Sequence, residues 1–339
     1  MKNAYCKRFC FFLALSLLAC LISACTPKLD LEEKTGEPAV TRETKSEEKT
    51  SVEPMETVTT EETKEDVPDP AEDGVLRVLM IGNSFCYYFP DELCGLAASA
   101  GIPIQVCNVY YSGCTLKQHW EWLQNGESNY SFFIHDENGS VKKSTYNLRR
   151  CLAAENWDVI TIQQHFGTQT AVSYEKCINS CLPYGQNLLN FLKSECPKAK
   201  IYFQQTWAYQ VGYNGGGGPV PDTATQTAHH ENIRRACLEF CAETGLDRIP
   251  SGDAWALARK NPVIGDTLCN KGPGGDATLG DFYHDGTTGG GQYLNACVWF
   301  EVLTGRSCVG NAFRPTDYTL DEAKATALQS IAHQAVLAL

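Results

Sequence analysis

Ser84 could act as a nucleophile. It follows Gly82 and Asn83 at the end of an apolar run over residues 75–81. A continuous apolar run of this length predicts a buried parallel strand. Because a helical segment begins soon afterwards, Ser84 is expected at a strand-to-helix turn, where its backbone N–H can face a developing oxyanion. A serine at such a turn can also act as a helix N-cap. The turn alone therefore leaves a nucleophile and a cap as alternatives.

A serine hydroxyl needs a base, and the chain offers seven histidines. His284 alone has a carboxylate three positions upstream on the same short turn, namely Asp281. Asp281 could hold the His284 ring in one tautomer while the other ring nitrogen faces the serine. His165 is the main alternative base, because it closely follows a predicted strand. The remaining histidines are His119, His135, His229, His230 and His333.

Strand-like and helix-like segments alternate along the chain from residue 75 onwards. This alternation predicts an α/β domain, a three-layer α/β/α sandwich with a mostly parallel sheet, whose ligand site lies beyond the carboxyl ends of the strands. A turn signal within the segment 125–147 predicts an inserted hairpin. The expected strands are 75–81, 104–109, 158–163, 200–204 and 247–250, and the expected helices are 90–100, 115–123, 174–193, 228–244, 252–259, 291–303 and 320–337.

The segment around Ser84 resembles the first sequence block of SGNH, or GDSL-type, hydrolases, with Asn83 where many members have aspartate. The sequence Asp281-x-x-His284 resembles their last block. The resemblance implies a flavodoxin-like sheet and a catalytic triad of Ser84, His284 and Asp281. Relatives often have a histidine at the position of Thr288, but the three-residue spacing between aspartate and histidine favours His284.

Two further blocks lie between these ends, in the order that the family has them. Residues 112–120 are similar to the second block, whose glycine, here Gly113, donates a backbone N–H to the oxyanion. Residues 157–164 are similar to the third block, which usually supplies an asparagine side chain as another donor. This chain has Gln163 and Gln164 there, and either amide could replace it. Nearly the whole predicted domain is similar to the DUF4886-type branch of this superfamily.

The resemblance implies a serine esterase that removes a small acyl group, most simply acetyl, from a carbohydrate through an acyl-enzyme. No cofactor is expected, and no His/Asp set has the spacing of metal ligands. The domain is expected to be a monomer. The main alternative is a surface protein of the same fold that binds glycan without turnover, and a lipase would need a wide apolar groove. Residues that could form an aromatic platform for sugar rings are Trp120, Trp122, Trp207, Tyr209, Tyr213 and Trp255. The alternative is that they belong to the core, where such residues more often lie.

The N-terminal region is expected to be a processing signal rather than part of the fold. A basic start precedes a short apolar run that ends in the sequence LISAC at residues 21–25, which resembles a lipobox. We expect a signal peptide at 1–24, a lipidated Cys25 with a disordered tether to residue 74, and a hydrolase-like domain at 75–339. The protein would be exported and held at a membrane by its lipid alone. An ordinary secretory signal, without a role for Cys25, is the alternative.

The formal net charge of −12 arises mostly from the tether, so it indicates a solvated spacer rather than an acidic binding face. No cluster of basic residues suggests nucleic acid as a partner. Cysteine is abundant, with 17 residues. An odd number of them lies beyond the signal region, so they cannot all pair within the chain. We expect them to be small buried apolar residues, although an exported location permits some disulfides.

Overall fold

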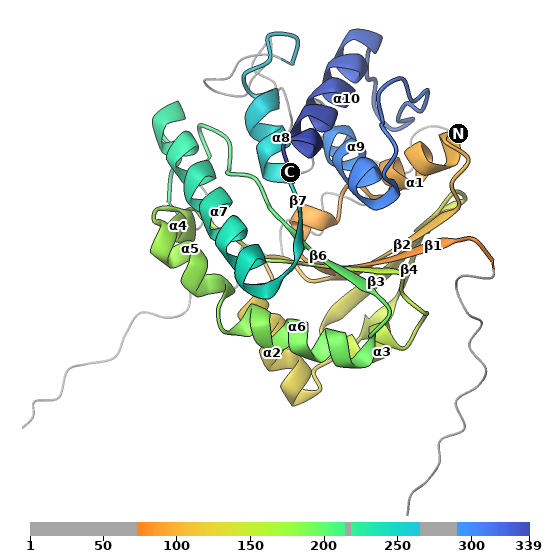
Figure 1. Cartoon of the computed structure of the whole chain (residues 1–339), viewed down its shortest axis with the longest axis vertical. Helices are drawn as coiled ribbons and strands as arrows, with labels where there is room; N and C mark the ends of the chain where they lie inside the picture. The colour runs from red at the N-terminus through yellow and green to blue at the C-terminus, as the bar shows by residue number, and fades with distance from the viewer. Residues whose placement is uncertain (1–72, 214–217, 265–289) are drawn as a thin grey trace, which may run out of the picture. The chain divides into compact units, whose positions relative to one another are not determined.

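The computed structural model describes residues 73–213, 218–264 and 290–339. Within these ranges, seven strands form one sheet in the order β4-β3-β2-β1-β5-β6-β7 (Figure 1). Five strands run parallel, and β3 and β4 form an antiparallel hairpin beside β2. The strands are β1 (Leu76–Gly82), β2 (Ile104–Tyr110), β3 (Tyr130–Asp136), β4 (Gly139–Tyr146), β5 (Val159–Gln163), β6 (Lys200–Gln204) and β7 (Asp247–Ile249).

Helices cover both faces of the sheet, and each group encloses its own hydrophobic core (Figure 1). In β1, Val78 and Met80 point into one core, whereas Leu79 and Ile81 point into the other. Burial on both faces explains why the strand is a continuous apolar run. One face carries α1 (Pro90–Ser99), α8 (Ser251–Ala258), α9 (Gly291–Thr304) and α10 (Glu322–Leu337), and the other carries α2 (Leu116–Asn125), α3 (Leu148–Leu152), α4 (Thr168–Ala171), α5 (Tyr174–Cys181), α6 (Tyr184–Glu195) and α7 (Thr223–Thr244).

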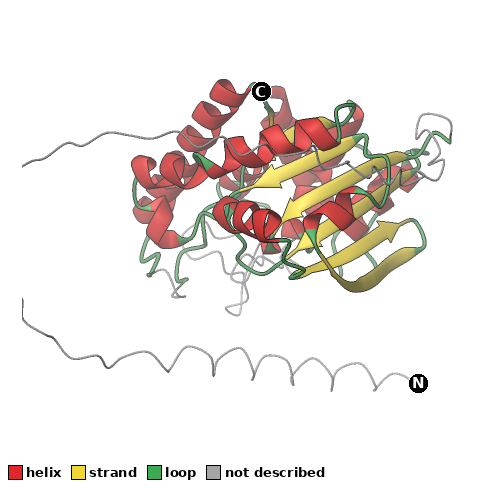
Figure 2. Cartoon of the chain, turned by 90° about the horizontal axis from the view of Figure 1, so that it is seen from below, coloured by secondary structure: helices red, strands yellow, loops and turns green. Residues whose placement is uncertain are grey.

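The sandwich with a mostly parallel sheet is as predicted. The parallel strands follow the order β2-β1-β5-β6-β7, which is the flavodoxin-like arrangement. Their arrowheads point to one edge in Figure 2, and one hairpin strand runs the opposite way. The predicted hairpin in the insertion is therefore confirmed. Because the strand order reverses between β1 and β5, the crevice beyond their carboxyl ends is the expected ligand site.

The long helix predicted for residues 174–193 is wrong, because two helices, α5 and α6, occupy this segment. Pro183 lies between them, and a proline inside a helix removes a backbone donor and clashes with the preceding turn. The helix predicted to begin at residue 228 starts earlier, at Thr223, where the Asp222 side chain accepts a hydrogen bond from the Thr225 N–H at 2.7 Å. The short helices α3 and α4 were not predicted.

The twelve cysteines of the described ranges are free thiols. All are buried except Cys196, which is half-buried. Burial raises the pKa of Cys86 and of Cys177 to about 12, so these thiols stay protonated at neutral pH. The interpretation of the cysteines as small buried apolar residues is confirmed for this part of the chain.

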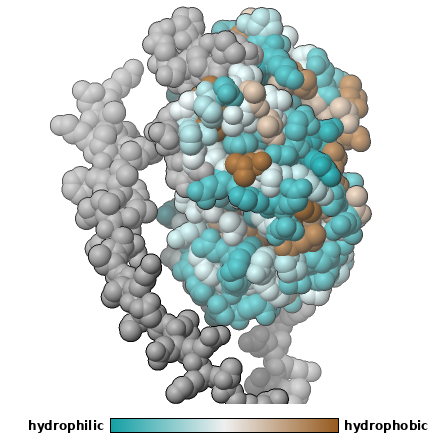
Figure 3. All heavy atoms as spheres, turned by 90° about the vertical axis from the view of Figure 1, so that its left-hand side faces the viewer, coloured by the Kyte–Doolittle hydropathy of each residue, from teal (hydrophilic) through white to brown (hydrophobic). Residues whose placement is uncertain are grey.

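The surface seen in Figure 3 is largely hydrophilic, and its hydrophobic residues form small separate patches. Val172, Leu238 and Val309 are among the large apolar side chains that are exposed, and scattered residues of this kind are ordinary on a protein surface. None of the helices in the described ranges has the length and apolar character that crossing a bilayer would require.

Glu92 on α1 should make the stability of the domain depend on pH. Its side chain is buried, and burial, with Asp91 and Asp317 nearby, raises its pKa to about 8. The folded state therefore retains a proton that the unfolded chain, with a glutamate pKa of about 4.3, has lost, and stability falls as pH rises from about 4.5 to 8. We expect Glu92→Gln to raise Tm at pH 8.5 and to change it little at pH 5. Thermal melts of this variant and of the exposed control Glu243→Gln, which should match the parent at both pH values, test this.

Candidate active site

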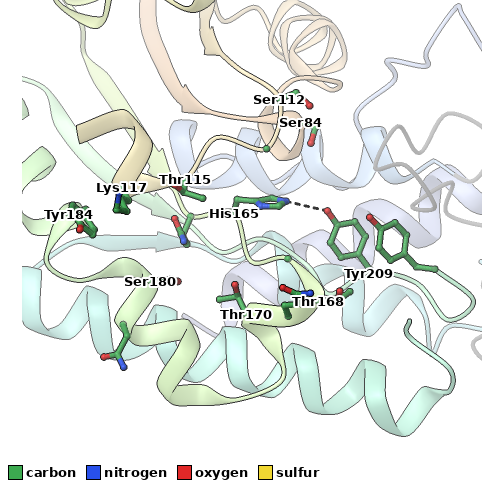
Figure 4. A pocket seen from close by; sticks show the side chains of 16 residues that line it. Ser84, Ser112, Thr115, Lys117, His165, Thr168, Thr170, Ser180, Tyr184 and Tyr209 are labelled. Carbon is green, nitrogen blue, oxygen red and sulfur yellow. Dashed lines mark hydrogen bonds between the residues drawn. The ribbon is translucent and has the colours of Figure 1, made fainter. Parts of the chain in front are cut away.

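A cavity of about 630 Å³ lies at the carboxyl edge of the sheet (Figure 4). Ser84, in the turn after β1, lines this cavity, and so does Gly113, in the loop after β2. Gln164 and His165 follow β5 directly, and Tyr209 follows β6. The cavity therefore occupies the point where the strand order reverses, as the sheet topology predicts. Its other lining residues are Ser112, Thr115, Lys117, Gly167, Thr168, Gln169, Thr170, Asn179, Ser180, Tyr184 and Tyr213.

Ser84 begins a single 3₁₀ turn, Ser84–Cys86, and only 8% of its surface is exposed. The cap of this turn is Asn83, whose side-chain oxygen accepts a hydrogen bond from the Phe85 N–H at 3.0 Å. Neither the hydroxyl nor the backbone N–H of Ser84 donates a hydrogen bond to another residue of the described ranges. Asn83, and not Ser84, is therefore the cap of this turn, and no other described residue accepts a hydrogen bond from the hydroxyl or the N–H of Ser84.

Gly113 lies in the turn between Tyr111 and Cys114, closed by a hydrogen bond from the Cys114 N–H to the Tyr111 carbonyl at 3.2 Å. Its φ is 65°, in the left-handed region that glycine adopts without a steric penalty. The Gly113 N–H, like that of Ser84, makes no hydrogen bond within the described part of the chain. The same cavity therefore contains two backbone donors that no described residue pairs.

The two glutamines that the sequence left as alternatives have different positions. Gln164 lines the cavity, and its Oε1 accepts a hydrogen bond from the Leu116 N–H at 2.8 Å. With the oxygen held by the helix α2 terminus, the NH₂ group of Gln164 is its remaining donor. Gln163 does not line the cavity and instead donates from Nε2 to Asn83 Oδ1 at 2.6 Å. The structure brings Gln164 together with Ser84 and Gly113 at the cavity. Gln163 contacts the Ser84 turn through Asn83 and does not line the cavity.

Asn83 joins the Ser84 turn to the Gly113 loop. Its Nδ2 donates to the Cys114 carbonyl oxygen at 2.9 Å, and the side chain is completely buried. An aspartate, which many SGNH hydrolases have at this position, would lose this donor and place a carboxylate against the carbonyl oxygen. The hydrogen bond to the Cys114 carbonyl therefore favours asparagine over aspartate at position 83 in this chain.

His165 is the one histidine of the described ranges that lines the cavity. Its Nε2 lies 3.4 Å from the Tyr209 hydroxyl, as the dashed line in Figure 4 marks. Burial lowers the pKa of His165, so its ring is neutral at physiological pH. A neutral imidazole beside a tyrosine hydroxyl can donate or accept a hydrogen bond from a ligand.

Four other histidines of the described ranges have partners away from the cavity. His119 is buried against the Tyr130 hydroxyl at 2.9 Å, and burial lowers its pKa to about 3. His135 is paired with Asp91 at 2.6 Å. His333 is paired with Glu301, and His230 lies 3.6 Å from Asp253. The predicted triad partners His284 and Asp281, with Thr288 and the predicted lipidation residue Cys25, lie outside the described residues.

Of the six aromatic residues considered for a sugar platform, Trp207 and Trp255 belong to the core, which is the alternative interpretation. Trp207 and Trp255 are buried and stack on each other with ring centroids 4.5 Å apart. Trp120 and Trp122 pack against the second core. Of the six residues, Tyr209 and Tyr213 line the cavity, with ring centroids 4.1 Å apart.

The wall formed by α4, α5 and α6 was missed in the sequence. It contributes Thr168, Thr170, Asn179, Ser180 and Tyr184 to the cavity. These residues have no motif, and they reach the cavity because the segment after β5 breaks into short helices rather than one long helix. Pro183 is the signal that could have indicated the break.

The fold and the site define an α/β/α protein with a polar cavity at the carboxyl edge of a flavodoxin-like sheet. Residues 77–335 match the family described as "Domain of unknown function (DUF4886)", and the chain belongs to this family. The predicted family branch is therefore confirmed, whereas lipidation at Cys25 stays a prediction.

Among solved structures, the chain is similar to a DUF4886 family protein from Bacteroides uniformis, with 27% identity, a TM-score of 0.65, and 78% of this chain and 95% of that chain covered. A provisional SGNH hydrolase from Slackia heliotrinireducens has 16% identity and a TM-score of 0.41, with 67% and 98% covered. A provisional GDSL-like lipase from Parabacteroides merdae has 12% identity and a TM-score of 0.40, with 77% and 95% covered. No curated protein shows significant sequence similarity.

Proposed function

We propose that this chain is a serine esterase that hydrolyses small acyl esters, with Ser84 as its nucleophile. The observation that carries the proposal is the convergence of three donors at one cavity. The backbone N–H groups of Ser84 and Gly113 are unpaired within the described ranges, and the NH₂ of Gln164 belongs to the same cavity. Donors grouped beside a serine hydroxyl suit the oxyanion of an acyl-transfer reaction.

In the proposed reaction, His284 removes the proton of the Ser84 hydroxyl as its Oγ attacks the ester carbonyl carbon. Asp281 holds His284 in the required tautomer. The negative oxygen that forms accepts hydrogen bonds from the N–H groups of Ser84 and Gly113 and from Gln164. The alcohol then leaves with the proton from His284. A water molecule, deprotonated by His284, attacks the acyl carbon, and the acid leaves as Ser84 Oγ takes the proton back from His284. The roles of His284 and Asp281 rest on their sequence spacing and on the family resemblance.

The lining of the cavity supports a polyhydroxylated substrate with a short acyl group. Hydroxyl, amide and phenol groups dominate, and no lining residue from the described ranges is aliphatic. Tyr213, which is half-buried and stacks on the buried Tyr209, offers aromatic surface for a sugar ring. A long acyl chain would need an apolar groove to be desolvated, and the hydrophobic residues on the face drawn in Figure 3 form only small separate patches. We therefore propose an acylated carbohydrate as the substrate. We also propose that the domain acts at the cell surface, where a lipid on Cys25 anchors it.

A panel of esters tests the proposed substrate class. The full chain should hydrolyse p-nitrophenyl acetate and release acetate from an acetylated oligosaccharide, whereas p-nitrophenyl decanoate should react at least about tenfold more slowly. Rates are measured at equal enzyme concentration, by absorbance and by acetate release. A preference for decanoate would contradict the proposal in favour of a lipase. Glycan binding without turnover of any ester would favour the non-catalytic binder.

A further inference from the structure

Three amide side chains on three different strands reach the turn that carries Ser84. Asn108 lies on β2, Gln163 ends β5, and Gln204 ends β6 opposite Gln163. All three are at most 1% exposed. Each strand therefore contributes a buried amide side chain from its carboxyl-terminal half, the half nearest the cavity.

Each amide donates its NH₂ group to a different acceptor of the same turn. Asn108 Nδ2 donates to the Cys86 carbonyl at 2.7 Å, and Gln204 Nε2 donates to the Phe85 carbonyl at 2.9 Å. Gln163 Nε2 donates to the Asn83 side chain at 2.6 Å. The three bonds hold the residue before Ser84 and the two residues after it, so they fix the turn from both sides.

The acceptor oxygens of the same three amides are unused. Asn108 Oδ1, Gln163 Oε1 and Gln204 Oε1 are buried without a hydrogen-bond partner in the described structure. A buried amide oxygen without a partner is destabilising, and an apolar side chain of similar size would avoid that penalty. Stability alone therefore does not account for three half-satisfied amides around one turn, whereas a need for their donors does.

The end of β1 is shaped to admit one of these side chains. A Cβ atom on Gly82 would lie 2.7 Å from Gln163 Cγ and 2.9 Å from Cys86 Sγ, closer than real contacts allow. Glycine at this position lets the Gln163 side chain cross beside β1 and reach Asn83. The backbone and the amide are therefore fitted to each other directly before Ser84.

We propose that Asn108, Gln163 and Gln204 are positioning residues, which hold Ser84 in register with the Gly113 N–H and the Gln164 amide. This inference rests on the proposed esterase function. Reacting groups must be held close to the productive geometry, and a displacement of about 1 Å can lower the rate about 100-fold. Loss of one donor leaves two others on the turn, so each single variant should reduce turnover without abolishing it.

The test compares Gln163→Met and Gln204→Met with Gln329→Met in the full chain. Gln329 is an equally buried glutamine that donates to the Tyr293 hydroxyl at 2.8 Å and to the Asn311 carbonyl at 2.9 Å, away from the Ser84 turn. Reactive Ser84 is counted by labelling with a fluorophosphonate, and kcat for p-nitrophenyl acetate is expressed per labelled site. Unfolded protein neither labels nor turns over, so a variant that only loses folded protein keeps the same kcat per labelled site.

We expect kcat per labelled site to fall about tenfold in Gln163→Met and in Gln204→Met, with KM changed by less than about twofold. Gln329→Met should lower Tm and keep the kcat of the parent per labelled site. Parental kcat in both turn variants would overturn the inference. If a methionine variant does not fold, Gln163→Asn or Gln204→Asn, which keeps the amide on a shorter side chain, gives the same comparison. An unmodified protein that neither labels nor turns over would contradict the proposed function instead.

Discussion

Replacing Ser84 with alanine is expected to lower ester hydrolysis by at least ~10⁴-fold, because the covalent acyl-enzyme can no longer form. Stability should be preserved, since Asn83 and not Ser84 caps the turn, and the Ser84 hydroxyl has no hydrogen-bond partner in the described ranges. Steady-state rates with p-nitrophenyl acetate, together with thermal melts, measure both effects. A Tm within about 2 °C of the parent would show that the loss is chemical.

Two pairs of variants sharpen the assignment of the nucleophile and the base. Ser112 lines the same cavity, and Ser112→Ala should retain most of the activity. His284→Ala should lose about as much as Ser84→Ala, whereas His165→Ala should lose about tenfold or less. If His165→Ala were the inactive variant and His284→Ala active, the base would be His165, which the structure places in the cavity.

The second large effect is expected at Gln164. In Gln164→Glu, the side chain keeps an oxygen for the Leu116 N–H, but it has no amide donor and adds negative charge where the oxyanion forms. Loss of one oxyanion donor typically lowers kcat by ~10²–10³-fold, and the charge adds to this. KM should change little, because the interaction develops in the transition state. The measurement is kcat and KM for p-nitrophenyl acetate at pH 8.

A charge control separates the loss of the donor from a general electrostatic effect. Gln169 is an exposed residue on the wall of the same cavity, and Gln169→Glu adds the same charge without removing the proposed donor. We expect its kcat to stay within about threefold of the parent. An equal fall in both variants would indicate that the field in the cavity, and not the Gln164 amide, controls the rate.

The strands β1, β5 and β6 could be predicted closely because burial on both faces makes each one a short, mostly apolar run. Ser84 and Gly113 could be placed because motifs identify them. The choice between Gln163 and Gln164 could not be made, because successive side chains at a strand end point in opposite directions and the end itself is uncertain by a residue. The choice between a platform and a core could not be made for Trp207 and Trp255, since aromatic composition alone does not distinguish a cavity wall from a core.

Part of the site could still have been noticed in the sequence. Asn108 and Gln204 are polar residues inside strand-like apolar runs, and a polar residue in a fully buried strand indicates a specific hydrogen-bond partner. What the pattern does not reveal is the partner itself. That depends on the register between β2, β1, β5 and β6, which is a property of the assembled sheet.

The hairpin beside β2 and the shortness of β7 also determine how the sheet ends. An open sheet edge offers unpaired backbone groups to another chain, so natural proteins protect it against edge-to-edge aggregation. At one end, the outer strand β4 carries the exposed residues Lys142 and Lys143, and charge of this kind disfavours pairing. At the other end, β7 spans only Asp247–Ile249, too short to template a strand from a second molecule. Both described edges of the sheet therefore carry features that disfavour strand pairing between copies of the domain.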